Sequence, residues 1–175
     1  KYVEDGFVVC PGLFSGSELE ALRGEIVGIA RGDRGAVHGV VQQPEKKNDT
    51  AAASDENDDA ALLSRFLAFH HPHKLSPVLK AALKHDGLVQ VLSDLIGSPN
   101  VKCMQSMYFF KGPGKPGQAW HQDEQYIPTR DRSLVGAFIA IEDTDVENGC
   151  LWMHAGSQRT GVLYRMAAHN DSRFD

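Results

Sequence analysis

The 175-residue sequence lacks the features of several classes of protein. It has no basic run, and its net charge is −5, so we expect neither a nucleic-acid partner nor an anionic membrane partner. The longest apolar run, around Leu134 to Ile141, is far too short to span a bilayer. No signal-peptide pattern opens the chain, and Lys1 in place of a leading Met predicts that the true N-terminus is missing.

Cysteine is also scarce. Cys10, Cys103 and Cys150 lie far apart without a CxxC pair, which argues against a disulfide framework and against a zinc cluster. Each cysteine has apolar neighbours, so we expect three small, buried hydrophobic side chains. Reduced thiols of this kind predict a cytoplasmic protein.

The composition is that of an ordinary globular protein, with 42% apolar and 23% charged residues. The length allows one domain with a real core but not two comfortable ones. We therefore expect residues 1–175 to form a single, partial domain. Within it, residues 1–100 should be mainly helical, and residues 101–175 should supply the first strands of a β core.

Helical patterns dominate the N-terminal region. Ser17 with Glu20 fits a capping box, which predicts a helix from about 17 to 31. Three further helices are expected at Leu62–Phe69, Leu75–Lys84 and Leu88–Ile96, the last ending at Gly97.

Two polar segments of this region look like metal sites but have simpler explanations. Residues 42–60 contain an acidic cluster without the spacing of an EF-hand, so a solvated loop is expected. The sequence His70-His71-Pro72-His73 has no carboxylate or cysteine partner at metal-site spacing. Loop and helix-end histidines are the expectation there.

Strand patterns dominate the C-terminal region. Val101–Lys111 is apolar on both faces and predicts a sandwiched strand, and 134–141 and 150–153 predict two more. Gln105 shares a face with Met107, where it would lie beside a polar ligand or be satisfied by the backbone. Helices first and strands second indicate an α+β fold with an antiparallel sandwich or jelly-roll core.

The loop Gly112–Gly117 matches G-x-G-x-x-G, but two prolines stiffen it and an extended segment follows. The dinucleotide fingerprint needs a helix at that point, so we reject it. The extended segment presents His121 and Asp123. Side chains two residues apart on a strand leave the same face, and a His with a carboxylate supplies two ligands of the facial triad that holds Fe(II). The alternative is a surface strand with two polar residues.

Four segments together resemble the phytanoyl-CoA dioxygenase (PhyH) family: Gln105–Lys111, Trp120–Asp123 (WHQD), Phe138–Asp143 and Glu147–Trp152 (ENGCLW). The resemblance implies a double-stranded β-helix (jelly-roll) core with N-terminal helices. It also implies a non-haem Fe(II) dioxygenase that hydroxylates a small molecule with 2-oxoglutarate and O₂ and releases succinate and CO₂.

The resemblance also assigns residues. His121 and Asp123 match the first two iron ligands, and five positions match the surroundings of 2-oxoglutarate: Met107, Gln122, Phe138, Gln105 and Arg65. The family's second iron His and its 2-oxoglutarate Arg lie beyond the ENGCLW segment, and the sequence stops at Asp175 before either, which predicts a C-terminally incomplete chain. Neither His154 nor His169 fits as the missing ligand.

Two alternatives remain open. The first is a non-catalytic jelly-roll binding module that keeps the pocket but holds no redox metal. The second is a cupin-type metalloenzyme that does not use 2-oxoglutarate, although such proteins gather several histidines in one short motif. The identity of the substrate cannot be read from the sequence.

Overall fold

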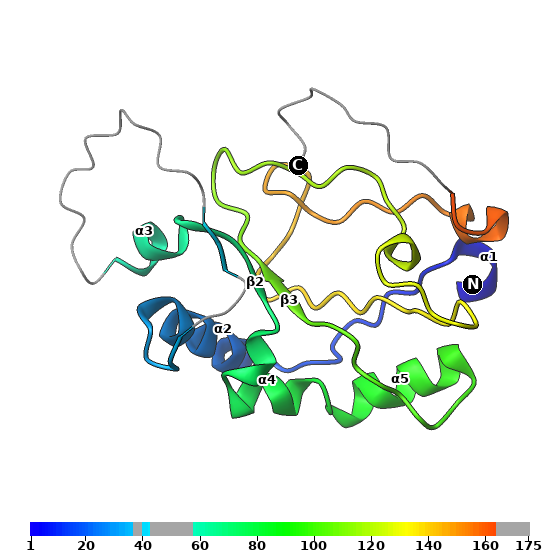
Figure 1. Cartoon of the computed structure of the whole chain (residues 1–175), viewed down its shortest axis with the longest axis horizontal. Helices are drawn as coiled ribbons and strands as arrows, with labels where there is room; N and C mark the ends of the chain where they lie inside the picture. Colours follow the sequence, from blue (N-terminus) through cyan, green and yellow to red (C-terminus); the bar gives the residue numbers. More distant parts are fainter. Residues whose placement is uncertain (37–39, 43–57, 164–175) are drawn as a thin grey trace. The chain divides into compact units, whose positions relative to one another are not determined.

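The computed structural model describes residues 1–36, 40–42 and 58–163 (Figure 1). The chain divides into two compact units. The first unit consists of Lys1–Leu13, Gln90–Val101 and Pro116–Asp175, and the second of Phe14–Val89 and Lys102–Lys115. The single domain predicted for 1–175 stays a prediction. Most of the predicted loop 42–60 lies outside the described residues.

A small antiparallel sheet organises the second unit. Its strands are β1 (Val40–Gln42), β2 (Phe66–His70) and β3 (Met107–Phe109), in the order β1-β2-β3. In the central pairing Phe69 lies opposite Tyr108, and His70 lies opposite Met107. Since helices from the same unit accompany this sheet, the predicted α+β class is confirmed (Figure 1).

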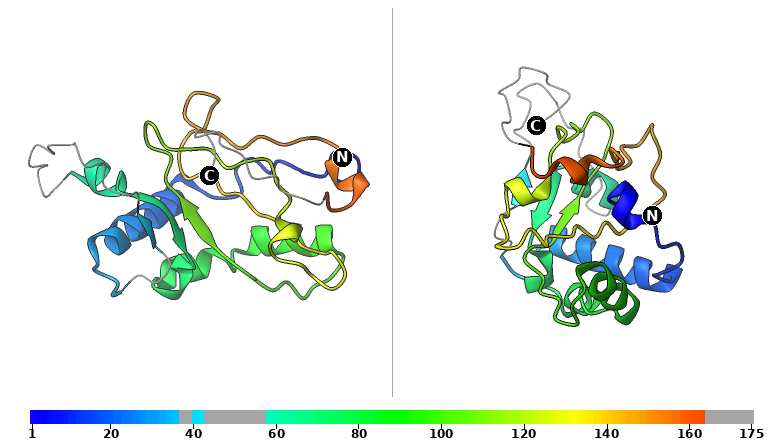
Figure 2. Two further views of the ribbon diagram at one scale, coloured as in Figure 1. Left: turned by 45° about the horizontal axis from the view of Figure 1, so that its top comes forward. Right: turned by 90° about the vertical axis from the view of Figure 1, so that its right-hand side faces the viewer.

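The hydrophobic core of this unit joins helix α2 (Gly16–Arg31) to the sheet. Ile26 and Ile29 on α2 are fully buried against three phenylalanines: Phe66, Phe69 and Phe110. The Phe69 ring meets the Phe110 ring edge to face, with centroids 4.8 Å apart. Burying each such side chain is worth about 1.5–3 kcal/mol, so this cluster holds α2 against the strands (Figure 2).

Helix α2 is capped by an earlier serine than the sequence analysis predicts. The Ser15 hydroxyl accepts a hydrogen bond from the Glu18 N–H, and the Glu18 carboxylate accepts one from the Ser15 N–H at 2.8 Å. Ser17 and Glu20 have the same spacing, but Ser17 lies inside the helix. The predicted capping box is therefore wrong, although the helix itself is confirmed.

The remaining helices of the chain confirm some expectations and correct one. Helix α5 (Asp86–Ile96) and its left-handed Gly97 are confirmed, and α4 (Pro77–Ala82) forms the middle of the expected helix 75–84. The helix predicted for Leu62–Phe69 is wrong. Only α3 (Asp59–Leu63) is helical, and Phe66–His70 is strand β2, because pairing on both edges overrides a weak helical pattern.

Strand β3 is shorter than the predicted strand 101–111 and is not sandwiched. Met104 and Phe109 are exposed, whereas Phe110 is buried. Of the histidines expected in loops and helix ends, His71 precedes the short 3₁₀ helix η1 (Pro72–Lys74) and His73 lies in it, whereas His70 ends strand β2 and corrects the expectation. His73 Nδ1 lies 2.6 Å from the Ser106 hydroxyl.

The first unit contains α1 (Tyr2–Asp5), the C-terminal half of α5, and two 3₁₀ helices, η2 (Asp123–Gln125) and η3 (Ser157–Thr160). Its described residues include no strand, so the strands predicted at 134–141 and 150–153 are not formed here. A strand exists only when its backbone pairs with another, and no described segment pairs with these two.

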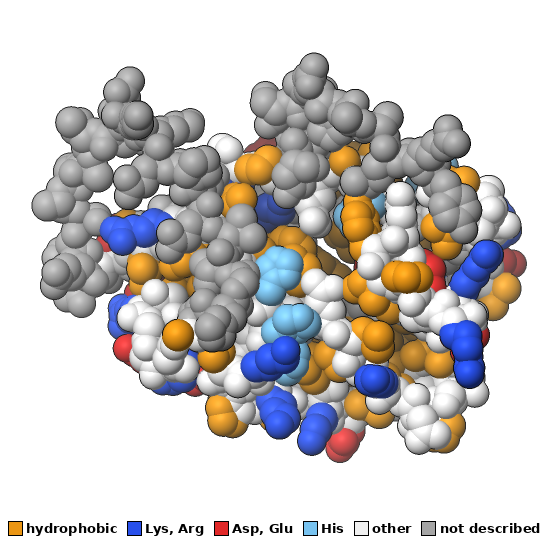
Figure 3. All heavy atoms as spheres, in the orientation of Figure 1, with side chains coloured by type: hydrophobic (Ala, Val, Ile, Leu, Met, Phe, Trp, Pro, Cys, Tyr) orange, Lys and Arg blue, Asp and Glu red, His pale blue; other side chains and the backbone are white. Residues whose placement is uncertain are grey.

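Many large apolar side chains of this unit are exposed, and hydrophobic side chains are visible at several places on the face drawn in Figure 3. Examples in the unpaired segments and around them are Trp120, Phe138, Leu151, Trp152 and Met153. The prediction that the three cysteines are buried is also wrong. Cys10 and Cys103 are exposed and Cys150 is half-buried, and none of the three lies in a described strand. None of the described helices has the length and apolar character that crossing a bilayer needs.

Candidate metal site

His121 is held in one orientation by its own turn. Its Nδ1 lies 2.7 Å from the Ala119 carbonyl oxygen. A carbonyl oxygen can only accept, so Nδ1 donates to it, and Nε2 is the ring nitrogen that remains for another partner. The Tyr126 ring meets the imidazole edge to face at 5.6 Å and further fixes the ring plane. Metal-binding histidines are oriented in this way, through the nitrogen that does not bind the metal.

The second ring nitrogen of His121, Nε2, faces Asp123. His121 Nε2 lies 3.3 Å from Asp123 Oδ1. Two neighbouring ligands of an octahedral ion, each about 2.1 Å from it, lie about 3.0 Å apart. The two side chains are thus about as far apart as two adjacent ligands of one divalent ion.

The shared direction of the two side chains comes from a single extended residue and not from a strand. Gln122 has φ −119° and ψ 127°, which places its neighbours on the same side of the chain. Asp123 then begins η2. The same-face relation of His121 and Asp123 therefore agrees with the expectation, whereas the strand that was expected to produce it is absent.

The side chain of Gln122 is used within the chain. Its Nε2 donates to the Gly161 carbonyl at 3.1 Å, and its Oε1 accepts from the Leu163 N–H at 2.6 Å. The amide thus pairs with a short piece of backbone in the way that a neighbouring strand would. These contacts tie the segment after η3 to the turn that holds His121 and Asp123.

The structure separates the other predicted site residues into the two units. Phe138 belongs to the first unit, with His121, Gln122 and Asp123, and its side chain is 56% exposed. Gln105, Met107 and Arg65 belong to the second unit. There Met107 begins β3, Gln105 is half-buried two residues before it, and Arg65 is exposed directly before β2.

One residue that contacts the site was not singled out from the sequence. A Cβ atom on Gly136 would lie 3.2 Å from Asp123 Oδ2. The sequence did carry a signal for Gly136, since an isolated glycine inside an apolar, strand-like run often marks the close approach of another group. Ala119 gave no signal, because it acts through its backbone.

A third protein ligand is not found among the residues that the structure describes: no group of three or more His, Cys, Asp or Glu side chains could hold a metal ion there. His154 lines an open hollow with Trp120 and Met153. His169 lies outside the described residues.

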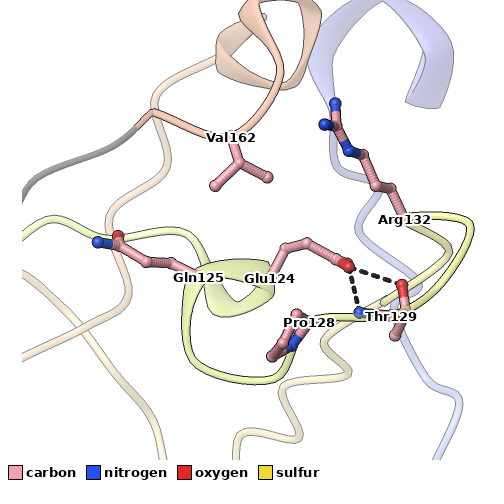
Figure 4. Close-up of a pocket in the computed structure, with 6 residues that line it drawn as sticks. All are labelled: Glu124, Gln125, Pro128, Thr129, Arg132 and Val162. Atoms are coloured by element: carbon pink, nitrogen blue, oxygen red, sulfur yellow. Dashed lines mark hydrogen bonds between the residues drawn. The ribbon is translucent and has the colours of Figure 1, made fainter.

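A cavity of about 210 Å³ adjoins η2, lined by Glu124, Gln125, Pro128, Thr129, Arg132 and Val162 (Figure 4). The Thr129 hydroxyl and N–H both donate to Glu124 Oε1 at 2.6 Å, and these bonds hold the pKa of Glu124 below its usual range. The volume is below that of typical ligand pockets, and Glu124 is already committed to Thr129. We interpret the cavity as a feature of the packing of the turn.

The structure is that of an α+β protein in which a histidine and a carboxylate face each other 3.3 Å apart. Comparison with known families makes the class specific: residues 2–175 match the family model "Phytanoyl-CoA dioxygenase (PhyH)". The chain belongs to this family, as its motifs predict, and the family has a cupin or jelly-roll fold.

Three relatives show how far the likeness extends. Phytanoyl-CoA dioxygenase 1 of Oryza sativa subsp. japonica is 31% identical over 98% of this chain and 68% of its own length. Phytanoyl-CoA dioxygenase domain-containing protein 1 of Bos taurus is 30% identical over 95% of this chain and 66% of its own length. Phytanoyl-CoA dioxygenase of Arabidopsis thaliana is 36% identical over 61% of this chain and 38% of its own length. The chain thus spans about two thirds or less of these relatives, and no solved structure matches it significantly.

Proposed function

We propose that the protein is a non-haem Fe(II)- and 2-oxoglutarate-dependent dioxygenase that hydroxylates a small molecule and releases succinate and CO₂. The observation that supports this most directly is the 3.3 Å approach of His121 Nε2 to Asp123 Oδ1, in a chain that belongs to a family whose members are named dioxygenases. Fe(II), 2-oxoglutarate and O₂ are the cofactor and cosubstrates of this proposal.

The two side chains have distinct tasks in the proposed site. His121 offers a neutral nitrogen whose direction is set by the Ala119 carbonyl, and Asp123 offers a negative oxygen that offsets part of the metal charge. When bound, Fe(II) supplies the activation of O₂, with 2-oxoglutarate as the co-reductant. Two protein ligands on one side leave the other positions for a third ligand, the cosubstrate and oxygen.

The presence of Asp123 favours hydroxylation. Halogenases related to this family have a small residue at the carboxylate position, and chloride binds to the metal in its place. Here a carboxylate occupies that position and faces the imidazole nitrogen, so the proposed site has no room for a halide there.

We assign the cosubstrate surroundings by the family resemblance: Gln105, Met107, Gln122, Phe138 and Arg65. 2-Oxoglutarate carries two carboxylates and needs a cationic partner, for which a guanidinium with two parallel N–H donors is well suited. We propose that this arginine, like the third metal ligand, comes from residues outside those described.

The double-stranded β-helix remains within the proposal. Its support is the pattern of the first unit, where the apolar segments 134–141 and 150–153 form no strand and have exposed side chains such as Trp152. Apolar segments of this kind are stable as strands once further strands pair with them.

The decisive experiment is an assay of the intact protein for succinate released from 2-oxoglutarate, with and without Fe(II). Uncoupled turnover makes the assay feasible without a known substrate. We expect iron-dependent succinate in the wild type, its loss in His121→Ala, and its retention in the control His154→Ala. Succinate no higher than in a metal-free control would overturn the proposal.

The same assay separates the enzyme from a non-catalytic module of the same fold. The module is favoured by one observation, namely that no third metal ligand occurs among the described residues. A module would release no succinate in any variant. A cytoplasmic location remains a prediction from the cysteines.

A further inference from the structure

The two oxygens of Asp123 face different neighbours. Oδ1 lies 3.3 Å from His121 Nε2. Oδ2 faces the backbone of Gly136, where an added Cβ would lie 3.2 Å from it. The carboxylate is therefore held between an imidazole on one side and a bare backbone on the other.

The glycine at position 136 is not required by its backbone conformation. Nine glycines of the described chain have positive φ, and Gly136 is not one of them. Its φ is one that any L-residue adopts without strain. What distinguishes glycine from alanine here is only the space that a Cβ would take from Asp123.

This space matters little to stability and greatly to metal binding. The Asp123 side chain is 57% exposed, so a shift of a few tenths of an ångström costs the fold almost nothing. Metal–ligand distances, by contrast, are fixed to about ±0.2 Å. A displacement that is too small to affect folding is therefore large enough to spoil a coordination site.

We propose that Gly136 is a positioning residue for the metal site: the absence of its side chain seats Asp123 Oδ2 and so aims Oδ1 at the ion that His121 Nε2 shares. This inference rests on the proposed function, since it needs Asp123 to be a ligand. It assigns a role in the site to the segment 134–141 that the family motifs do not give to this glycine.

The test uses the intact protein and Mn²⁺, a redox-stable probe of the Fe(II) site, titrated by electron paramagnetic resonance. The variants are Gly136→Ala and Gly136→Val, which add increasing bulk against Asp123. Gly16→Ala is the matched control, because it adds the same methyl group at an ordinary φ with nothing within 4 Å. Thermal unfolding of each variant is followed in parallel.

We expect the Kd for Mn²⁺ to rise about 10-fold in Gly136→Ala and about 100-fold in Gly136→Val, the range seen when groups that orient metal ligands are changed. Gly16→Ala should bind as the wild type does, and the unfolding midpoints of the Gly136 variants should stay within about 2 °C of the wild type.

Unchanged Mn²⁺ affinity in Gly136→Val would overturn the inference while leaving the proposed function intact. A loss of affinity matched by a large fall in the unfolding midpoint of Gly136→Ala would also overturn it, since Gly136 would then be structural. If the wild type itself binds no Mn²⁺ and releases no succinate, the proposed function has failed, and that result is distinct from the other two.

Discussion

His121 and Asp123 face each other across one extended residue, with Nε2 and Oδ1 3.3 Å apart. An ion pair and a shared metal ion both produce this geometry, and they differ in what the carboxylate contributes. An exposed ion pair is worth about 0–1 kcal/mol. A metal ligand is needed for the ion to bind at all.

The variant Asp123→Asn distinguishes an ion pair from a shared metal ion, because it keeps the size of the side chain and removes its charge. We expect Mn²⁺ affinity and succinate release to fall at least about 100-fold, with the free energy of unfolding changed by less than about 1 kcal/mol. Asp94→Asn on α5, where the carboxylate accepts from Gln90, is the control and should change neither. Mn²⁺ affinity equal to that of the wild type in Asp123→Asn would contradict the role of Asp123 as a charged ligand.

A second prediction concerns the amide of Gln122. It bonds the Gly161 carbonyl and the Leu163 N–H, so Gln122→Ala leaves both backbone groups without this partner. We expect a loss of about 1–2 kcal/mol and faster hydrogen exchange at the Leu163 amide. Gln125→Ala is the control, because Gln125 lies in the adjoining 3₁₀ helix and the Leu163 N–H donates to Gln122 instead. Equal exchange at Leu163 in the wild type and Gln122→Ala would contradict this role.

Some features of this architecture follow from sequence and others do not. Helices α2 and α5 are predictable because their apolar residues recur at helical spacing and each ends at a left-handed glycine, Gly32 and Gly97. Strand β2 cannot be predicted in this way, because Phe66–His70 is a short apolar run whose periodicity does not distinguish helix from strand. Its partners lie far away in sequence, at β1 and β3.

The candidate site shows the same division. The pair His121 and Asp123 is readable because residues two apart share a side whenever the residue between them is extended. The approach of Gly136 to Asp123 depends on how the chain returns, and no local rule supplies it. The Ala119 carbonyl is local to His121, but a backbone acceptor leaves no mark in the side-chain sequence. The strand expected at 134–141 fails because pairing is a property of two segments and not of one.

The start of α2 offers a third prediction in which two serines compete. Ser15→Ala removes the side-chain acceptor of the Glu18 N–H and should cost about 1 kcal/mol in urea unfolding. Ser17→Ala changes a helical position and should be nearly neutral or slightly stabilising, since alanine is the better helix former. If Ser17→Ala lowered the free energy of unfolding more than Ser15→Ala did, the helix would be capped by Ser17 and Glu20, as the sequence predicts.

The last prediction concerns pH and the second unit. Hydrogen bonds from Arg34 (Nε 3.0 Å and Nη2 2.8 Å) and from the buried Ser76 hydroxyl lower the pKa of Glu25 from 4.5 to about 2. A carboxyl whose pKa is lower in the folded state than in the unfolded state stabilises the fold above the unfolded value. That stabilisation is lost as the pH falls from about 4.5 towards 2.

Glu25→Gln should therefore destabilise the protein by about 2 kcal/mol near neutral pH, and the difference from the wild type should shrink steadily below pH 4.5. Urea unfolding of both proteins across this range measures the difference directly. Glu20→Gln, on the same helix, is the control for the loss of an α2 carboxylate other than the one that bonds Arg34 and Ser76. A difference between the wild type and Glu25→Gln that stays constant down to about pH 2 would mean that the charge of Glu25 does not stabilise the fold.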